Sequence, residues 1–254
     1  MARLLLIGAT GHIGGAVLEQ VTRTFPTIKI SALLRDQKKA DRLQTQYPNV
    51  KTLIGNLHTT DVVKNAAKEA DIVINNVPHR NEGNLVFASH PRVSVAIVLP
   101  VMVYGLSPSV EHPFPLTFPE YLKGIRSLGN GFTISNGANV MGYVHGPKAY
   151  YFASSQEMSF RTLTSQMVNV LKGLGVLESD TVTIIDVSGA AKASGAIDND
   201  DPQSWAKHIA ASCGVNMRVR PSRALMVGWE PREVEFVDTI EEVSRRFLEN
   251  ERTS

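Results

Sequence analysis

A glycine-rich turn near the N-terminus limits the fold of this chain more than any other feature. Residues 8–15 read GATGHIGG, and the run Arg3–Ile7 before them is short, apolar and continuous. Such a run is typical of a parallel strand that is buried on both faces. After the glycines, apolar side chains recur with the spacing of one helix face: Ile13, Ala16, Val17 and Val21. The glycines therefore connect a predicted strand to a predicted helix.

An alternating apolar pattern over residues 28–34 predicts a second strand, which completes a strand–helix–strand unit. In such a unit the helix N-terminus presents unpaired N–H groups and the positive end of its dipole to an anion. Glycines let the backbone approach a pyrophosphate closely. The pattern thus predicts a dinucleotide bound at this turn, and the alternative is a tight turn without a ligand.

The residue after the second strand indicates which dinucleotide is bound. In units of this kind an acidic residue about 20 positions after the glycines holds the ribose 2′-hydroxyl, whereas an arginine accommodates a 2′-phosphate. Arg35 stands at this distance from Gly14, and Asp36 follows it directly. We favour Arg35 and NADP over Asp36 and NAD. A solvated arginine at the end of a strand is the alternative without a ligand.

Two more strands are predicted over Lys51–Ile54 and Asp71–Asn75, with a helix capped by Thr59 or Thr60 between them, and a strong apolar run follows at 93–99. Together they predict an α/β fold, a Rossmann-like doubly wound parallel sheet. Ligands of such sheets lie beyond the carboxyl ends of the strands. The candidate contacts there are Gly55, Asn56, Leu57, Asn75 and Asn76, the last two of which are equally typical of a turn.

The second half of the chain predicts a smaller C-terminal substrate lobe. Short strands are expected at 132–134, 150–153 and 181–186, and helices at 121–128, 160–174 and 203–212. Thr239 and Glu242 have the spacing of a capping box for a last helix, whose apolar face holds Ile240, Val243 and Phe247. We expect a dinucleotide-binding core over residues 1–105 and a lobe over residues 106–254, packed as one unit.

Composition excludes several classes of protein. The chain has 254 residues, 43% of them hydrophobic, and a formal net charge of +2, so its composition excludes a mainly disordered protein. Its longest apolar stretch, at 93–103, is shorter than the roughly 20 residues that a bilayer requires. The lone Cys213 excludes an internal disulfide framework and a cysteine-based zinc site. No metal, nucleic acid or membrane is expected as a partner, and a reducing cytoplasm is the expected compartment.

With these residues in view, the chain resembles the extended (atypical) short-chain dehydrogenase/reductase family, which includes nucleoside-diphosphate-sugar epimerases and related reductases. The glycine turn and Arg35 contribute to this resemblance. Three further segments carry it: AIVLPVMVYG at 96–105, YYFASSQEMSFRTL at 150–163 and SRALMVGWEPREVEF at 222–236.

The resemblance implies a function and a set of contacts. It implies an NAD(P)-binding oxidoreductase or epimerase that acts on an aldehyde, ketone or hydroxyl group of a small molecule. It places Pro100 and the VYG stretch at the nicotinamide end. It implies that six residues hold the pyrophosphate: Gly8, Thr10, Gly11, His12, Ile13 and Gly14. The oligomeric state stays open, a homodimer included.

One departure from the family puts activity in doubt. Family members use a Tyr-x-x-x-Lys helix, in which tyrosine acts as acid and base. The match at 47–51 contains Pro48, which argues against a helix, and the length between Val77 and Val93 leaves no room for the family's fifth strand and catalytic helix together. Catalytic residues are therefore unassigned, with four candidates for a substitute: Tyr104, Tyr143, His145 and Lys148. The alternatives to an enzyme are a catalytically silent NADP-binding sensor or partner-binding protein, and a shortened form of an active enzyme.

Overall fold

The structure is a computed structural model of the whole chain. It describes residues 1–76, 97–100, 103–115, 117–134, 150–153, 157–195, 213, 221–226, 228–230 and 235–253. These residues form two compact units, the first made of Met1–Val95 with Leu106–Pro113 and the second of Ala96–Gly105 with Phe114–Ser254. Residues 96–105 thus belong to the second unit and residues 106–113 to the first, whereas the sequence predicts a single boundary after residue 105.

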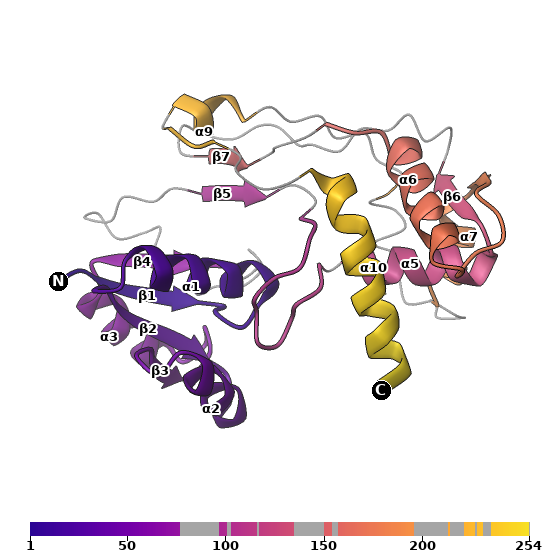
Figure 1. The fold of residues 1–254 in the computed structure, drawn as a ribbon. Helices are drawn as coiled ribbons and strands as arrows, with labels where there is room; N and C mark the ends of the chain where they lie inside the picture. The colour runs from indigo at the N-terminus through magenta and orange to yellow at the C-terminus, as the bar shows by residue number, and fades with distance from the viewer. Residues whose placement is uncertain are drawn as a thin grey trace. The chain divides into compact units, whose positions relative to one another are not determined.

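The first unit is built on a parallel sheet of four strands, which confirms the predicted Rossmann-like fold class (Figure 1). The strands are β1 (Arg3–Ile7), β2 (Lys29–Leu34), β3 (Lys51–Ile54) and β4 (Ile72–Asn75), in the spatial order β3-β2-β1-β4. Ile7, the last residue of β1, is in register with Leu33 on one side and with Asn75 on the other. The carboxyl ends of these strands therefore meet at one edge of the sheet.

Helices cover both faces of this sheet. They are α1 (His12–Thr24), α2 (Gln37–Gln46) and α3 (Thr60–Glu69). Leu4 and Leu6 of β1 pack in one buried cluster with Leu18 of α1 and Leu43 of α2, whereas the alternate residues Leu5 and Ile7 pack with Val63 of α3. This alternation is the period of two expected for a strand that is buried on both faces.

The predicted apolar face of α1 is partly wrong. The buried residues of the helix are Gly14, Gly15 and Leu18, whereas Ile13 is 37% exposed and Ala16 is exposed as well. The helix turns its glycines toward the rest of the unit because a residue without a side chain permits a close approach of the backbones. Glycine has no apolar side chain, so the spacing of apolar residues predicted a neighbouring face of α1 as the buried one.

The outer edge of the sheet lies at β4. Among the described strands β4 pairs with β1 alone, and its first residue, Ile72, is 48% exposed. The sequence between Val77 and Val93, where the length leaves no room for the family's fifth strand and catalytic helix, lies outside the described residues.

The second unit contains two pairs of parallel strands (Figure 1). One pair is β5 (Ile97–Pro100) with β7 (Tyr150–Ala153), and the other is β6 (Gly131–Ile134) with β8 (Val182–Ile185). The helices are α5 (Thr117–Leu128), α6 (Phe160–Gly173), α7 (Val187–Ala193), α9 (Ser222–Met226) and α10 (Phe236–Thr253). Ser159 caps α6 as predicted, because its hydroxyl accepts the N–H of Thr162.

The structure of this unit differs from the predictions in several places. The helix expected from residue 121 already begins at Thr117, and α7 was not predicted at all. The capping box at Thr239 is wrong, since α10 begins at Phe236 and the Thr239 hydroxyl donates to the carbonyl oxygen of Phe236 inside the helix. The predicted face of that helix is correct, since Ile240, Val243 and Phe247 are buried. The helix predicted over 203–212 lies outside the described residues.

Candidate dinucleotide-binding site

The turn between β1 and α1 has the geometry of an anion-binding loop. Gly8 adopts a left-handed backbone conformation with φ of 83°, and its carbonyl oxygen accepts the N–H of Gly11 at 3.0 Å. Gly11 stands at the N-cap of α1 and has no side chain to accept a hydrogen bond from the first turn. The N–H groups that begin a helix lack partners within the helix. This turn therefore offers them to a ligand.

Two glycines make the turn as tight as it is. A Cβ atom on Gly14 would lie 1.9 Å from the carbonyl oxygen of Gly8, and one on Gly11 would lie 3.3 Å from the same oxygen. The first of these distances is impossible for any side chain. Gly14 thus holds the helix against the end of β1, which is the role that the glycine pattern assigns to such a residue.

Arg35 and Asp36 follow β2, and the structure separates their roles. The Asp36 carboxylate caps α2, because its Oδ1 atom accepts the N–H of Lys39 at 2.9 Å. Arg35 is exposed and has no hydrogen-bond or ion-pair partner among the described residues. The first turn of α2 contains Lys38 and Lys39 and no acidic residue, although a helix N-terminus favours negative charge. The end of β2 and the start of α2 therefore carry basic side chains that form no ion pair among the described residues.

The candidate contacts after β3 are occupied by local structure. The Asn56 side-chain oxygen accepts the N–H groups of His58 at 2.8 Å and of Thr59 at 3.2 Å, so it stabilises the turn that leads into α3. The Leu57 side chain is buried in the core. Gly55 donates its N–H to the carbonyl oxygen of Leu34. The backbone of this turn and the exposed amide nitrogen of Asn56 are left to contact a ligand.

Asn76 lies beside the glycine turn, at the carboxyl end of β4. Its backbone N–H donates to the carbonyl oxygen of Ile7 at 3.0 Å, directly before Gly8. Its side-chain nitrogen Nδ2 is buried and has no hydrogen-bond partner in the described structure. Buried polar atoms are nearly always paired, so such a donor calls for an explanation. A polar ligand bound at the glycine turn would explain this unpaired donor. Asn75, its neighbour, is in register with Ile7 inside the sheet.

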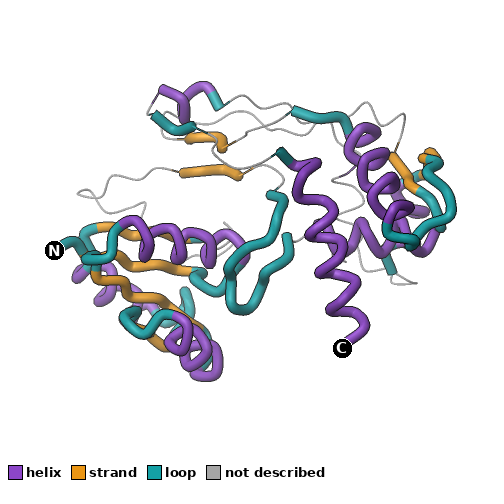
Figure 2. The backbone as a smooth tube through the Cα atoms, viewed as in Figure 1, coloured by secondary structure: helices purple, strands orange, loops and turns teal. Residues whose placement is uncertain are grey.

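The sequence reasoning missed a segment that packs on the glycine turn. Residues 107–113, which we call the strap, belong to the first unit and run beside the N-terminal end of α1 (Figure 2). The Ser107 and Ser109 hydroxyls donate to the carbonyl oxygens of His12 and Thr10. The His12 ring nitrogen Nδ1 donates to the carbonyl oxygen of His112, and burial lowers the pKa of this ring. No sequence signal links these residues, because their contacts depend on tertiary structure.

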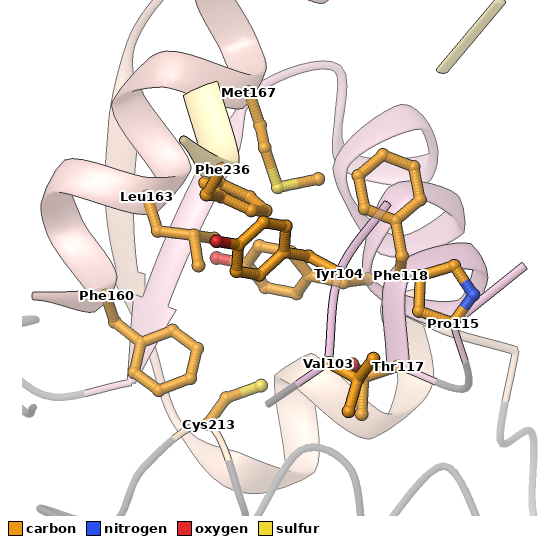
Figure 3. A pocket seen from close by; sticks show the side chains of 11 residues that line it. Val103, Tyr104, Pro115, Thr117, Phe118, Phe160, Leu163, Met167, Cys213 and Phe236 are labelled. Carbon is orange, nitrogen blue, oxygen red and sulfur yellow. The ribbon is translucent and has the colours of Figure 1, made fainter. Parts of the chain in front are cut away.

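Of the four candidates for acid–base catalysis only Tyr104 lies in the described part, and Tyr143, His145 and Lys148 fall outside it. The Tyr104 ring packs edge-on against Phe236, with centroids 5.2 Å apart. Both line a cavity of about 20 Å³ in the second unit, whose walls are almost entirely apolar (Figure 3). Burial raises the pKa of Cys213, which also lines it, to about 12. Pro100 ends β5, paired with Ala153 in the same unit.

The described residues show neither a candidate metal site nor a candidate membrane span. They contain no group of three or more His, Cys, Asp or Glu side chains that could hold a metal ion. None of their helices is long and apolar enough to cross a bilayer.

The N-terminal part of the chain is similar in sequence to known proteins. Residues 1–90 match the NmrA-like family. A stretch of 73 residues is 34% identical to an oxidase of an Acremonium species, Oxidase ucsJ. That stretch is 29% of this chain and only 21% of the oxidase, so the likeness spans about a fifth of that protein's length.

Solved structures with a similar fold cover nearly the whole chain. A dTDP-glucose 4,6-dehydratase from Bacillus anthracis has a TM-score of 0.61 and 12% identity over 99% of this chain and 98% of its own. A UDP-glucose 4-epimerase from Bifidobacterium longum has a TM-score of 0.58 and 10% identity, over 98% of this chain and 99% of its own. A nucleoside-diphosphate-sugar epimerase from Pseudomonas aeruginosa gives 0.58 and 11%, over 98% of both chains. The chain therefore has the fold of this dehydratase and these epimerases, as the resemblance implies, and its first 90 residues match the NmrA-like family.

Proposed function

We propose that this protein is an NAD(P)-dependent oxidoreductase of the extended short-chain dehydrogenase/reductase kind, acting on a carbonyl or hydroxyl group of a small molecule. The observation that carries the proposal is the β1–α1 turn, where a helix without a side-chain cap begins beside the unpaired Nδ2 donor of Asn76. A pyrophosphate accepts hydrogen bonds from both. Such a cofactor, when bound, supplies or accepts a hydride.

The residues of the turn would hold the pyrophosphate through their backbone. Gly8, Gly11 and Gly14 keep the approach free of side chains, and the N–H groups of His12 and Ile13 begin the helix. Thr10 lies in the turn between Gly8 and Gly11. The Asn76 amide would donate from the neighbouring strand end, with Asn75, Asn56 and Leu57 as further proposed contacts.

We favour NADP over NAD as the cofactor. Asp36 uses its carboxylate as a helix cap and is engaged there, whereas Arg35 is exposed with no partner in the described part of the chain. Lys38 and Lys39 add positive charge at the same helix end, and with Arg35 they exceed the single negative charge of the Asp36 cap. A 2′-phosphate is an anion that would offset this excess, and a 2′-hydroxyl is not.

The comparisons support the cofactor class. The dehydratase structure is a complex with NAD, and the epimerase structure is a complex with NAD+ and UDP. These neighbours are enzymes, so the comparisons do not favour a catalytically silent binding protein. They do not identify a substrate for this chain.

Turnover with a reduced cofactor tests the enzymatic part of the proposal. NADPH oxidation would be followed with a panel of aldehydes and ketones, and NADP reduction with the matching alcohols. Turnover that depends on both protein and substrate would support the proposal. Tight NADPH binding without turnover on any member of the panel would contradict it and would favour the silent sensor instead.

A further inference from the structure

Two buried serine hydroxyls of the strap hold the backbone of the glycine turn. Ser107 Oγ donates to the carbonyl oxygen of His12 at 2.6 Å, and Ser109 Oγ donates to that of Thr10 at 2.8 Å. A carbonyl oxygen only accepts, so the direction of both bonds is fixed. The two acceptors lie on either side of Gly11, the N-cap of α1.

Each hydroxyl is also held from the other side. Ser107 Oγ accepts the N–H of Ser109 at 3.1 Å, and Ser109 Oγ accepts the N–H of His112 at 3.1 Å. Both side chains thus donate one bond and accept one, and both serines are buried. Their rotamers are determined by the strap itself, before any ligand binds.

The strap is anchored independently of the two serines. Its ends are joined by the bond from the N–H of Ser107 to the carbonyl oxygen of Pro113 at 2.8 Å. Glu111 forms an ion pair with Arg42 of α2, with 2.9 Å between Nε and Oε1. The His12 ring adds a bond of 3.2 Å to the carbonyl oxygen of His112. Loss of one serine hydroxyl therefore leaves the strap attached.

Gly15 provides the surface on which the strap lies. A Cβ atom on Gly15 would come within 2.5 Å of Ser109 Cα and 2.6 Å of Ser109 Cβ. The glycine pattern that binds a pyrophosphate requires glycine at 8, 11 and 14 but not at 15. The fourth glycine of GATGHIGG is thus explained by the strap and not by the ligand.

We propose that Ser107 and Ser109 are positioning residues for the cofactor, an inference that rests on the proposed dinucleotide binding. A trans peptide group is planar, so its C=O and N–H point in opposite directions. The hydroxyl that holds the carbonyl of His12 thereby aims the N–H of Ile13 out of the helix N-terminus. The hydroxyl that holds the carbonyl of Thr10 fixes the peptide that leads into Gly11. The turn is ordered for the pyrophosphate in advance, so less of the binding free energy is spent on ordering it.

The test compares Ser107→Ala, Ser109→Ala and the double variant with wild type in the full chain. The dissociation constant of NADPH and the melting temperature without ligand are both measured. Loss of a typical hydrogen bond predicts a rise in the NADPH dissociation constant of about fivefold for each serine. Tyr47→Phe is the matched control, since it removes a hydroxyl bond of 2.8 Å to Glu19 in the same unit, away from the turn. This variant should lower the melting temperature without weakening the binding of NADPH.

A second ligand separates positioning from general destabilisation. Adenosine 2′-monophosphate contains the 2′-phosphate but no pyrophosphate, so its affinity should be unchanged in the serine variants. Equal weakening of both ligands, or an unchanged NADPH affinity in the double variant, would overturn the inference. Failure of the wild-type protein to bind NADPH at all is a different result, which would overturn the proposed function itself.

Discussion

The Asp36 carboxylate accepts the backbone N–H of Lys39 at 2.9 Å, and this bond holds the carboxylate at the start of α2. The cap occupies Oδ1 of the carboxylate and turns this oxygen toward the backbone of α2. Arg35, the preceding residue, is exposed. Asp36 thus caps α2, and the 2′-phosphate contact is proposed for Arg35.

Arg35→Gln tests this proposed contact. We expect the affinity for NADPH to fall about 10-fold or more, because a charge-assisted hydrogen bond contributes roughly 1.5–3 kcal/mol. Affinity for NADH should stay the same, since NADH lacks the 2′-phosphate. Asp36→Ala serves as the control: it should lower the free energy of unfolding by about 1 kcal/mol through loss of the cap and keep the preference for NADPH. A preference that disappears in Asp36→Ala but persists in Arg35→Gln would reverse the assignment.

Gly14→Ala should abolish dinucleotide binding and destabilise the first unit. The added Cβ would lie 1.9 Å from the carbonyl oxygen of Gly8, so α1 must move away from the sheet. Gly173, at the end of α6, has no atom within 4 Å of an added Cβ. Gly173→Ala should therefore be neutral or stabilising by up to about 1 kcal/mol. Melting curves of the two variants check both statements, and a harmless Gly14→Ala would show that the helix is not held at this distance.

The stability of the first unit should depend on pH through His12. Burial lowers the pKa of this ring below its ordinary value of 6.5, and the neighbouring His112 ring lowers it further, against two backbone hydrogen bonds that raise it. A group whose pKa is depressed in the folded state contributes stability that is present above its unfolded pKa and lost as the pH falls through the folded value. Unfolding by denaturant at several pH values below 7 should show this loss. His12→Gln should flatten that part of the profile, and an unchanged profile in this variant would contradict the role of the half-buried ring.

Tyr121→Phe should destabilise the second unit. The Tyr121 hydroxyl is buried, donates to the carbonyl oxygen of Phe132 at 2.5 Å and lies against the Thr164 hydroxyl, so its loss should cost about 1–2 kcal/mol. Lys172→Ala is the comparison, because it breaks an exposed ion pair with Asp180 and should cost less than about 1 kcal/mol. Thermal unfolding that ranks the two variants in the opposite order would refute this account of the core.

The strands of the first unit could be predicted closely from short apolar runs, and β1 is buried on both faces as expected. The observed bounds of β1 and β3, Arg3–Ile7 and Lys51–Ile54, are those that the sequence predicts. A continuous apolar run bounded by glycine or polar residues is a signal that needs no tertiary information. The glycine turn was predicted for the same reason, since its pattern is local.

Features that depend on distant contacts could not be predicted. Ser107 and Ser109 read as polar loop residues, and their partners lie almost one hundred positions earlier in the chain. The role of Gly15 depends on its contact with the strap, so it could not be predicted from the sequence. Thr239 and Glu242 match a capping box by spacing, yet the helix extends past them because Phe236 is buried and begins it. A local motif does not exclude a longer helix when packing stabilises the extra turn.

The central claim is that the β1–α1 turn binds a nicotinamide dinucleotide, with NADPH preferred. The most direct measurement is the melting temperature of the full chain without ligand, with NADPH and with NADH at equal concentration. At about 100 times its dissociation constant a ligand stabilises by roughly 2.7 kcal/mol, so NADPH should raise the melting temperature by about 5–10 °C and NADH by less. No shift with either nucleotide would contradict the account.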